Sequence, residues 1–309
     1  MRQTLLLIAM AIVGAAITVF EPRFLTVSNW LNIMDQAVVI GIVAVGVVLL
    51  MIGGGFDLSV GSSVVLSGYI IAICFANGVP TLLAIILALL GGLLLGVINA
   101  VGVAYLRIPS FIMTLGTLYA IRGFILFLSR GQTIGHAFPA SFTVLGKGNF
   151  ASVPIAVFIM LALYIVLHIV LKKTRFGRHT IAVGSDAETS RRLGINSRLH
   201  LAKLYVLCGT LAALAGLLLS SRINASTSDM GLGYELEAIA AVVIGGTSLF
   251  GGAGTVAGTL LGVVFLGMVH NGINMIGVSP YLATFAVGAL LLFSASVDVV
   301  TQWSRRNSK

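Results

Sequence analysis

Long apolar runs recur along the whole chain and are separated by short polar or glycine-rich stretches. A predominantly apolar run of about 20 residues crosses a bilayer as a helix, and shorter runs enter the membrane as re-entrant pieces. The sequence therefore predicts an all-α membrane protein, a polytopic bundle of about ten transmembrane or re-entrant helices. The runs cover residues 4–20, 36–53, 61–77, 80–105, 110–128, 152–171, 203–221, 236–249, 254–271 and 280–297.

Glycine-rich breaks interrupt the apolar pattern at two places. The first break reads "GGGFDLS" and follows the run 36–53, and the second reads "GGTSLFGG" within and after the run 236–249. Each joins two apolar runs through a glycine pair and a hydroxyl-containing stretch, which gives the chain a faint internal pseudo-repeat. Paired breaks in two halves are typical of transporters. The residues expected to break and cap these helices are Gly53, Gly54, Asp57, Ser59, Gly245, Gly246, Gly251 and Gly252.

Asp57 is an acid between two apolar runs, where a charge is costly. In one interpretation, Asp57 and Ser59 cap the exposed N–H groups of the next helix, because an unsatisfied N–H in lipid costs several kcal/mol. In the other interpretation, Asp57 relays protons or ions. No second intramembrane acid accompanies Asp57 in the sequence, so capping is favoured.

The composition excludes several classes of function. Hydrophobic residues make up 58% of the 309 residues and charged residues only 9%, with a mean hydropathy of +1.10, too few charges for a water-exposed surface. The two cysteines have no metal-ligand spacing, and the chain has no phosphate-binding loop and no hydrolytic motif. We therefore expect no metal site, no cofactor in this chain, no enzymatic activity and no nucleic-acid binding.

Basic residues predict the orientation of the chain. Eight of the 18 lysines and arginines lie between Lys172 and Lys203, and a loop so rich in positive charge stays in the cytoplasm. With six runs before this basic loop (residues 172–203) and four after it, both termini are expected to be cytoplasmic as well. The chain is thus expected to be one transmembrane domain, residues 1–309, that carries a single large cytoplasmic loop.

The polar stretch "GSDAETSRRLGINSRLHLAK" lies inside the basic loop. Ser185 and Glu188 have the spacing of a capping box, and Gly194 provides a left-handed stop. This predicts a short helix over about 186–193 and a second helix that starts near Asn196 or Ser197. Two short helices indicate a docking element, and a solvated face that contacts membrane lipid is the alternative.

Small and polar residues on the apolar runs indicate helix packing or a pathway. Small residues at four-residue spacing predict close helix contacts at Gly92, Gly96, Ala100 and Ala104, and at Gly254, Gly258 and Gly262. The candidates for lining a polar pathway, which could equally join helices to one another, are Asn99, Thr114, Thr117, Tyr119, Asn271 and Asn274.

The two breaks and the polar stretch of the basic loop together resemble a known family. The segments "GGGFDLSVGSSVVLSG", "SDAETSRRLGIN" and "GYELEAIAAVVIGGTSLFGG" are similar to those of the membrane permeases of sugar ABC importers, the group for ribose, arabinose, xylose, galactose and autoinducer-2. The likeness runs from about residue 20 to 300. "YAIRGF" and "HNGINMIGVSP" also fit, although His270 stands where relatives often have Asn.

The resemblance implies partners and a mechanism. It implies a second permease copy or paralogue, a periplasmic or lipid-anchored sugar-binding protein, and a cytoplasmic ABC ATPase that holds ATP and Mg²⁺. It also implies alternating access in the bacterial inner membrane, driven through a coupling segment that usually reads Glu-Ala-Ala and here reads Ala-Glu-Thr. The coupling residues carried over are Ser185, Asp186, Ala187, Glu188, Arg191, Arg192 and Gly194.

Three functions are therefore open at the level of sequence. The first is the permease subunit of an ABC importer for a monosaccharide or a similar small polar solute. The second is a proton-coupled secondary transporter that uses Asp57. The third, a membrane scaffold that moves nothing, is disfavoured because helix breaks in a membrane are tolerated only where they are buried in protein or line a cavity.

Overall fold

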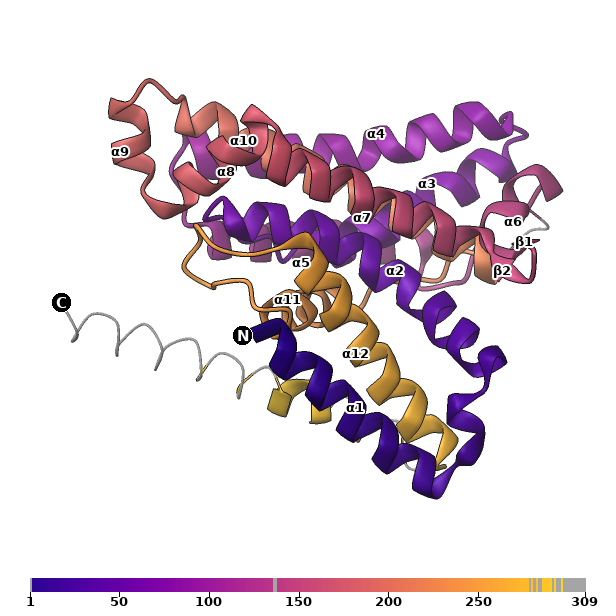
Figure 1. The fold of residues 1–309 in the computed structure, drawn as a ribbon. Helices are drawn as coiled ribbons and strands as arrows, with labels where there is room; N and C mark the ends of the chain where they lie inside the picture. The colour runs from indigo at the N-terminus through magenta and orange to yellow at the C-terminus, as the bar shows by residue number, and fades with distance from the viewer. Residues whose placement is uncertain are drawn as a thin grey trace.

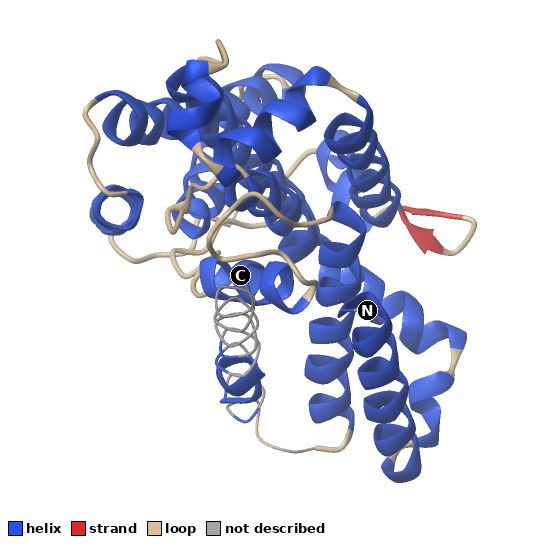
Figure 2. Cartoon of the chain, turned by 60° about the vertical axis from the view of Figure 1, so that its left-hand side comes forward, coloured by secondary structure: helices blue, strands red, loops and turns tan. Residues whose placement is uncertain are grey.

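The computed structural model describes residues 2–135 and 138–277, together with residues 279, 282, 285–290, 292 and 296. The described chain is a bundle of helices with one small hairpin (Figures 1 and 2). The helices are α1 (Arg2–Phe20), α2 (Val27–Ile52), α3 (Val60–Ala76), α4 (Thr81–Ala100), α5 (Ser110–Ser129), α6 (Ala140–Lys147), α7 (Ile155–Lys173), α8 (Arg175–Ser185), α9 (Ala187–Arg192), α10 (Ser197–Ile223), α11 (Tyr234–Ile244) and α12 (Val256–Met275). Shorter elements are the 3-10 turn η1 (Pro22–Leu25), the π turn η2 (Val101–Tyr105), and the antiparallel strands β1 (Asn149–Phe150) and β2 (Val153–Pro154).

The all-α membrane class is confirmed, but the expected count of about ten helices is not. Within the described residues, seven helices are long and apolar enough to cross a membrane: α1, α2, α4 with η2, α5, α7, α10 and α12. Helix α3 has 17 residues, and the run 236–249 yields only the 11 residues of α11 because the glycine pair ends the helix. The run 280–297 lies almost wholly outside the described residues.

Helix α2 begins nine residues before its apolar run. Thr26 caps the helix by accepting a hydrogen bond from the Asn29 N–H, so the polar first turns are helical as well. The same happens at α10, where Asn196 accepts a hydrogen bond from the Leu199 N–H and extends the helix before residue 203. Caps, which apolar periodicity does not register, thus set both helix starts.

Helices α2 and α10 form the centre of the bundle. In their most apolar windows, 78% of the residues of α2 and 72% of those of α10 are buried, against 17% for α1 and 11% for α5. Helix α10 packs against α4, α3 and α2, and α12 packs against α2 and α11 (Figure 1). The outer faces of α1 and α5 are covered by apolar side chains, as expected of helices that face lipid or another chain.

Two glycines of each predicted ridge form close helix contacts, whereas Gly254 lies before the start of α12. On α4, Gly92 and Gly96 lie against the backbone of α10, where a Cβ on Gly96 would stand 2.7 Å from the Tyr205 carbonyl oxygen. On α12, Gly258 and Gly262 lie against the carbonyl oxygens of Gly245 and Ala241 at the end of α11. These contacts hold the central helices closer than larger side chains would permit.

We expect Gly96→Leu to destabilise the protein because its side chain would have to displace the α10 backbone. Overpacking of this kind costs roughly 2 kcal/mol or more. The measurement is the melting temperature of the purified protein in detergent. Gly116→Leu on α5 is the matched control, since a Cβ at Gly116 meets nothing within 4 Å. An equal effect of the two substitutions would contradict the close α4–α10 contact.

Candidate functional site

The first helix break lies between α2 and α3. Helix α2 ends at Ile52, and the Gly55 N–H still bonds to the Leu50 carbonyl at 3.0 Å. Gly54 has a φ of +82°, a left-handed conformation that favours glycine. The chain therefore turns within three glycines and starts a new helix at Val60.

Asp57 is buried at the start of that new helix. Its Oδ1 atom accepts hydrogen bonds from the Ser59 N–H at 2.8 Å and from the Ser59 hydroxyl at 2.6 Å. The Oδ2 atom is also buried and has no hydrogen-bond partner in the described part of the chain. Ser59 itself occupies the cap position but donates to Asp57, so its side chain makes no cap of its own, contrary to the expectation for Ser59.

A chain of buried hydrogen bonds continues from Asp57 across three helices. The Asn99 amide on α4 donates to the Ser59 hydroxyl at 2.7 Å, and the Thr117 hydroxyl on α5 donates to the Asn99 carbonyl oxygen at 2.9 Å. Side-chain hydrogen bonds between helices help to fix the helices relative to one another in a membrane. Asn99 and Thr117, two of the candidate lining residues, thus join α3, α4 and α5.

The other candidate lining residues do not join this network. Asn271 on α12 exchanges two side-chain hydrogen bonds with Asn29 on α2, at 2.9 and 3.0 Å. Thr114 is buried and donates to the carbonyl of Ser110 in its own helix. Tyr119 and Asn274 are exposed. Of the six candidates, Asn99 and Thr117 are the pair joined by a hydrogen bond among the described residues, and the six do not form one shared lining.

The second helix break, residues 245–255, packs against the first. The Gly252 N–H donates to the Ile52 carbonyl at 2.8 Å, where α2 ends. A Cβ on Gly251 would stand 3.0 Å from the Cα of Gly54, so the two glycine stretches touch. The sequence aligns the two breaks as a pseudo-repeat, and the structure places them in contact.

Helix α8 lies against the joined breaks. Gly184, near the end of α8, contacts the Ile52 carbonyl, and a Cβ there would also stand 2.8 Å from the Gly252 nitrogen. The sequence did not predict α8 as a helix. Its start is set by Thr174, which accepts a hydrogen bond from the Gly177 N–H. We call this contact of α8 with both breaks, through Ile52, Gly184 and Gly252, the three-way joint.

The short helix α9 follows α8 directly and confirms the first helix expected in the basic loop. The second expected start, near Asn196 or Ser197, is confirmed by α10, although α10 is a long helix that continues to Ile223. Its cap is Asp186, whose Oδ1 accepts from the N–H groups of Glu188 and Thr189, both at 2.9 Å. These bonds from Thr189 and Glu188 hold the pKa of Asp186 below its usual range. The expected capping box of Ser185 and Glu188 is wrong, because Ser185 closes α8 by donating to the Ile181 carbonyl at 2.8 Å.

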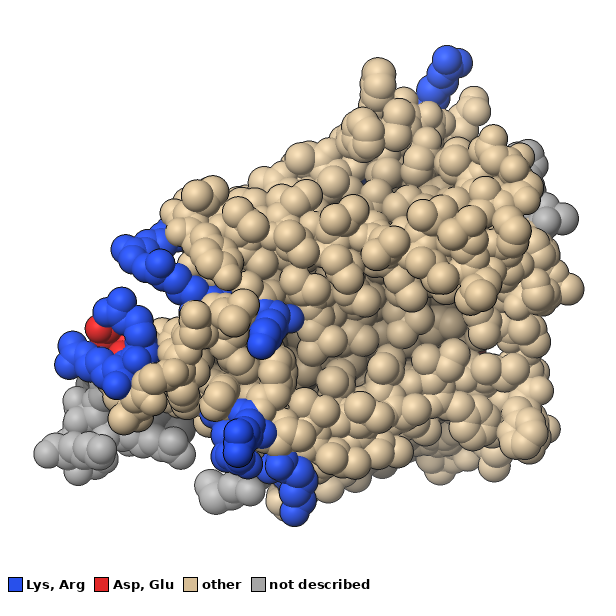
Figure 3. Space-filling model, turned by 90° about the horizontal axis from the view of Figure 1, so that it is seen from above, with Lys and Arg blue, Asp and Glu red and all other residues tan. Residues whose placement is uncertain are grey.

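The surface around α9 is strongly basic. Figure 3 shows lysines and arginines gathered at the end of the molecule where Figure 1 places α8 and α9, beside a largely uncharged surface. Arg191 and Arg192 contact Glu188 at 2.8 and 3.5 Å, and Gly194 ends the segment with a φ of +86°. The eight exposed basic residues of this end, called the basic end below, are Lys172, Lys173, Arg175, Arg178, Arg191, Arg192, Arg198 and Lys203.

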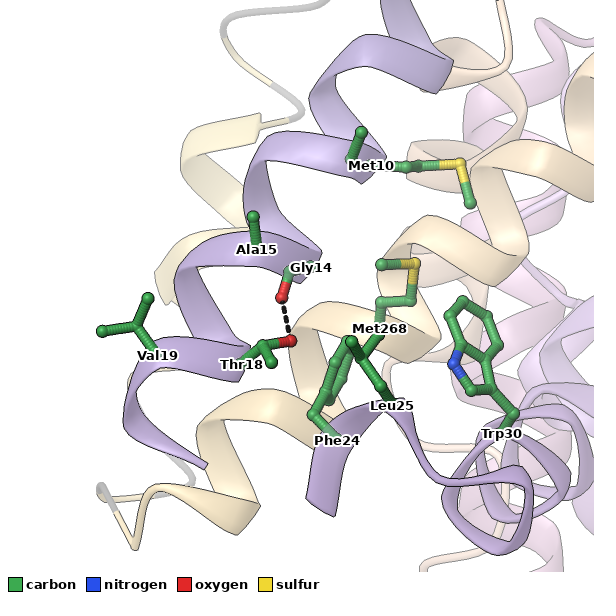
Figure 4. A pocket seen from close by; sticks show the side chains of 10 residues that line it. Met10, Gly14, Ala15, Thr18, Val19, Phe24, Leu25, Trp30 and Met268 are labelled. Atoms are coloured by element: carbon green, nitrogen blue, oxygen red, sulfur yellow. Dashed lines mark hydrogen bonds between the residues drawn. The ribbon is translucent and has the colours of Figure 1, made fainter. Parts of the chain in front are cut away.

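Cavities in the bundle differ in their chemistry. A cleft of about 610 Å³ between α1 and α12 is lined almost wholly by apolar groups such as Met10, Phe24 and Met268 (Figure 4). Its one hydroxyl, on Thr18, already donates to the Gly14 carbonyl at 2.6 Å. Besides this hydroxyl, the indole N–H of Trp30 is the other side-chain polar group of the lining, so the cleft suits an apolar occupant better than a polar solute.

A smaller cavity contains polar residues, Gln36 and Glu237 among them, that the sequence analysis did not single out. It has about 230 Å³, lies between α2, α11 and α12, and is lined by Gln36, Ala37, Ile40, Tyr234, Glu237, Val263, Leu266, Gly267 and His270. The available signal was Glu237, one of two acids in the first turn of α11. It was missed because His270, which lines the same cavity, lies on another helix.

Comparison with known proteins identifies the family. The model of the family "branched-chain amino acid transport system / permease component" matches residues 29–295. The ribose import permease protein of Escherichia coli K12 is 37% identical over 295 residues, which cover 94% of this chain and 92% of that protein. The ribose import permease protein of Bacillus subtilis 168 is 36% identical, with 91% and 88% covered.

A third relative is the galactose/methyl galactoside import permease protein of Escherichia coli K12, which is 34% identical and shares 92% of this chain and 90% of its own length. No solved structure matches the chain. The resemblance drawn from the two breaks and the basic loop is confirmed by these matches. The chain belongs to the family of membrane permease components described as branched-chain amino acid transport system permeases, together with import permeases for ribose and galactose.

Proposed function

We propose that this chain is the transmembrane permease subunit of an ABC importer that carries a monosaccharide or a similar small polar solute across the bacterial inner membrane. The observation that supports this most strongly is the three-way joint. The Gly252 N–H to Ile52 carbonyl bond and the contacts of Gly184 connect both helix breaks to α8, which leads directly into the exposed helix α9. Relatives named for ribose and galactose import favour a sugar.

Helix α9 is the proposed docking site for a cytoplasmic ATPase. It is exposed, rigidly capped by Asp186, and carries Arg191 and Arg192. Under the positive-inside rule the basic end lies in the cytoplasm, with both termini on the same side. The contact residues proposed for the ATPase, which binds ATP and Mg²⁺, are Ser185, Asp186, Ala187, Glu188, Arg191, Arg192 and Gly194.

The three-way joint gives a physical route from ATPase to pathway. Only two residues separate Gly184 from α9, so a displacement of α9 would reach the end of α2 at Ile52 and the second break at Gly252 through directly packed backbone. Packed interfaces respond to small displacements by switching between discrete arrangements. This arrangement supports alternating access driven from the basic end.

The remaining partners are proposed from the exposed helices and from the relatives. The sparse burial of α1 and α5 leaves apolar faces for membrane lipid and for a second permease copy or a paralogue. A periplasmic or lipid-anchored sugar-binding protein would deliver the solute at the end opposite the basic end. Few charges lie on the spanning helices, which suits a neutral hydroxylated solute.

Proton-coupled transport through Asp57 is the second candidate function. The observation that favours it is the buried Oδ2 atom, which lacks a partner in the described part of the chain. Against it, Oδ1 is engaged by Ser59 and the network continues to Asn99 and Thr117, which contain no further titratable group.

The docking proposal predicts that the double reversal R191E/R192E abolishes ATP-driven uptake. The two added acids would repel the acidic partner surface that a basic element selects, and they would also repel Glu188. The measurement is uptake of radiolabelled ribose and galactose by cells that carry the complete importer, with the amount of permease in the membrane followed in parallel. The control is K172E/K173E, which reverses the same number of charges at the end of α7, away from α9. Undiminished uptake by R191E/R192E would refute the docking assignment.

Asp57→Asn separates the two candidate functions. Asparagine keeps an oxygen that accepts from Ser59 but cannot carry a proton, so we expect ATP-driven uptake to persist within about twofold. Asp57→Ala removes the acceptor and should cost about 1 kcal/mol of stability, seen as a lower melting temperature. Uptake that follows an imposed pH gradient in the wild type and disappears in D57N would favour the proton-coupled function instead.

A further inference from the structure

The 230 Å³ cavity between α2, α11 and α12 is open and polar. Gln36, which lines it, is exposed, so the cavity reaches the surface of the chain. Glu237 on α11 and His270 on α12 contribute from facing helices. At roughly 30 Å³ for each water molecule, the space corresponds to seven or eight waters, enough for one monosaccharide ring.

The polar groups in this cavity are not paired with one another. The Nε2 atom of His270 is buried and has no hydrogen-bond partner among the described residues. None of the ion pairs among the described residues joins Glu237 to His270. Two complementary groups therefore face a shared space and leave it open.

The neighbouring polar pairs behave differently. Asn271, the residue after His270, is fully engaged with Asn29. Arg222 and Asp35, which line a larger polar cavity of about 410 Å³, are paired at 3.3 Å, and Arg222 also donates to the Asp35 carbonyl at 3.0 Å. Glu237 and His270, in contrast, form no such pair with each other and are left for a further partner.

An unpaired buried polar group in a membrane protein is costly and indicates a functional site. A carboxylate accepts hydrogen bonds, and an amide side chain both donates and accepts them. A neutral imidazole donates from one ring nitrogen and accepts at the other. Neighbouring hydroxyl groups of a neutral polyol can satisfy all three side chains at once. A cation would satisfy Glu237 but not a donating Gln36 amide or imidazole.

We propose that this cavity binds the hydroxyl groups of the transported solute inside the permease. Glu237 accepts a hydrogen bond from one hydroxyl of the solute, and Gln36 and His270 form hydrogen bonds with the adjacent hydroxyls. The inference rests on the proposed function and deepens it by naming a solute site within this chain.

The experiment measures protection of a cysteine placed in the cavity wall. In the full chain with C74A and C208A, the substitution Ile40→Cys is labelled by a small water-soluble methanethiosulfonate, with and without ribose or galactose. At a sugar concentration about ten times its Kd, labelling should slow about tenfold by mass action. Ile276→Cys is the matched control, because Ile276 is exposed outside the cavity and should show no protection.

Glu237→Gln in the same background should abolish most of the protection at that sugar concentration. Glu235→Gln is its control, since the Glu235 carboxylate lies against Gly61 of α3 rather than in the cavity, and protection should remain. Absence of labelling at Ile40→Cys, or labelling that no imported sugar slows, would overturn the inference.

Uptake by the complete wild-type importer distinguishes failure of the proposed solute site from failure of the proposed function. If ribose or galactose is imported but gives no protection, the solute site is refuted and the proposed function stands. If the complete importer takes up no sugar at all, the proposed function fails and the solute site fails with it.

Discussion

The structure depends on how backbone groups are satisfied where helices stop inside the membrane. A free N–H or C=O costs several kcal/mol in lipid, so a helix can break there only if something replaces the lost hydrogen bonds. Here the second break donates through Gly252 to the last carbonyl of α2, and Asp57 receives the N–H of Ser59 at the first break. The first break is thus capped from within by Asp57, and the second break satisfies the carbonyl at the end of α2.

The joined breaks lie between a group of hydrogen-bonded helices and the helix that leads to α9. The chain of Asp57, Ser59, Asn99 and Thr117 fixes α3, α4 and α5 relative to one another. On the other side of the breaks, Gly184 brings α8 within contact of the joined backbones. Under the proposed function, movement of α9 is transmitted through the three-way joint, while the hydrogen-bonded helices remain a rigid frame.

The sequence predicted the features that depend on local pattern. Apolar runs located the spanning helices, and four-residue spacing located the contacts of Gly92, Gly96, Gly258 and Gly262. Caps were less predictable, because Ser185 and Asp186 both suit the start of a helix and only the three-dimensional path of α8 decides between them. Groups that meet across helices, such as Glu237 and His270, could not be paired without knowing which helices are neighbours.

The central claim is that the three-way joint couples the basic end to the helix breaks. Gly184→Ala tests it directly, because the added methyl group would collide with the Ile52 carbonyl and the Gly252 N–H and force α8 away from the breaks. The measurement is the amount of solute imported for each ATP hydrolysed by the complete importer. The account predicts that this ratio falls several-fold while the ATPase remains bound and active; an unchanged ratio would contradict it.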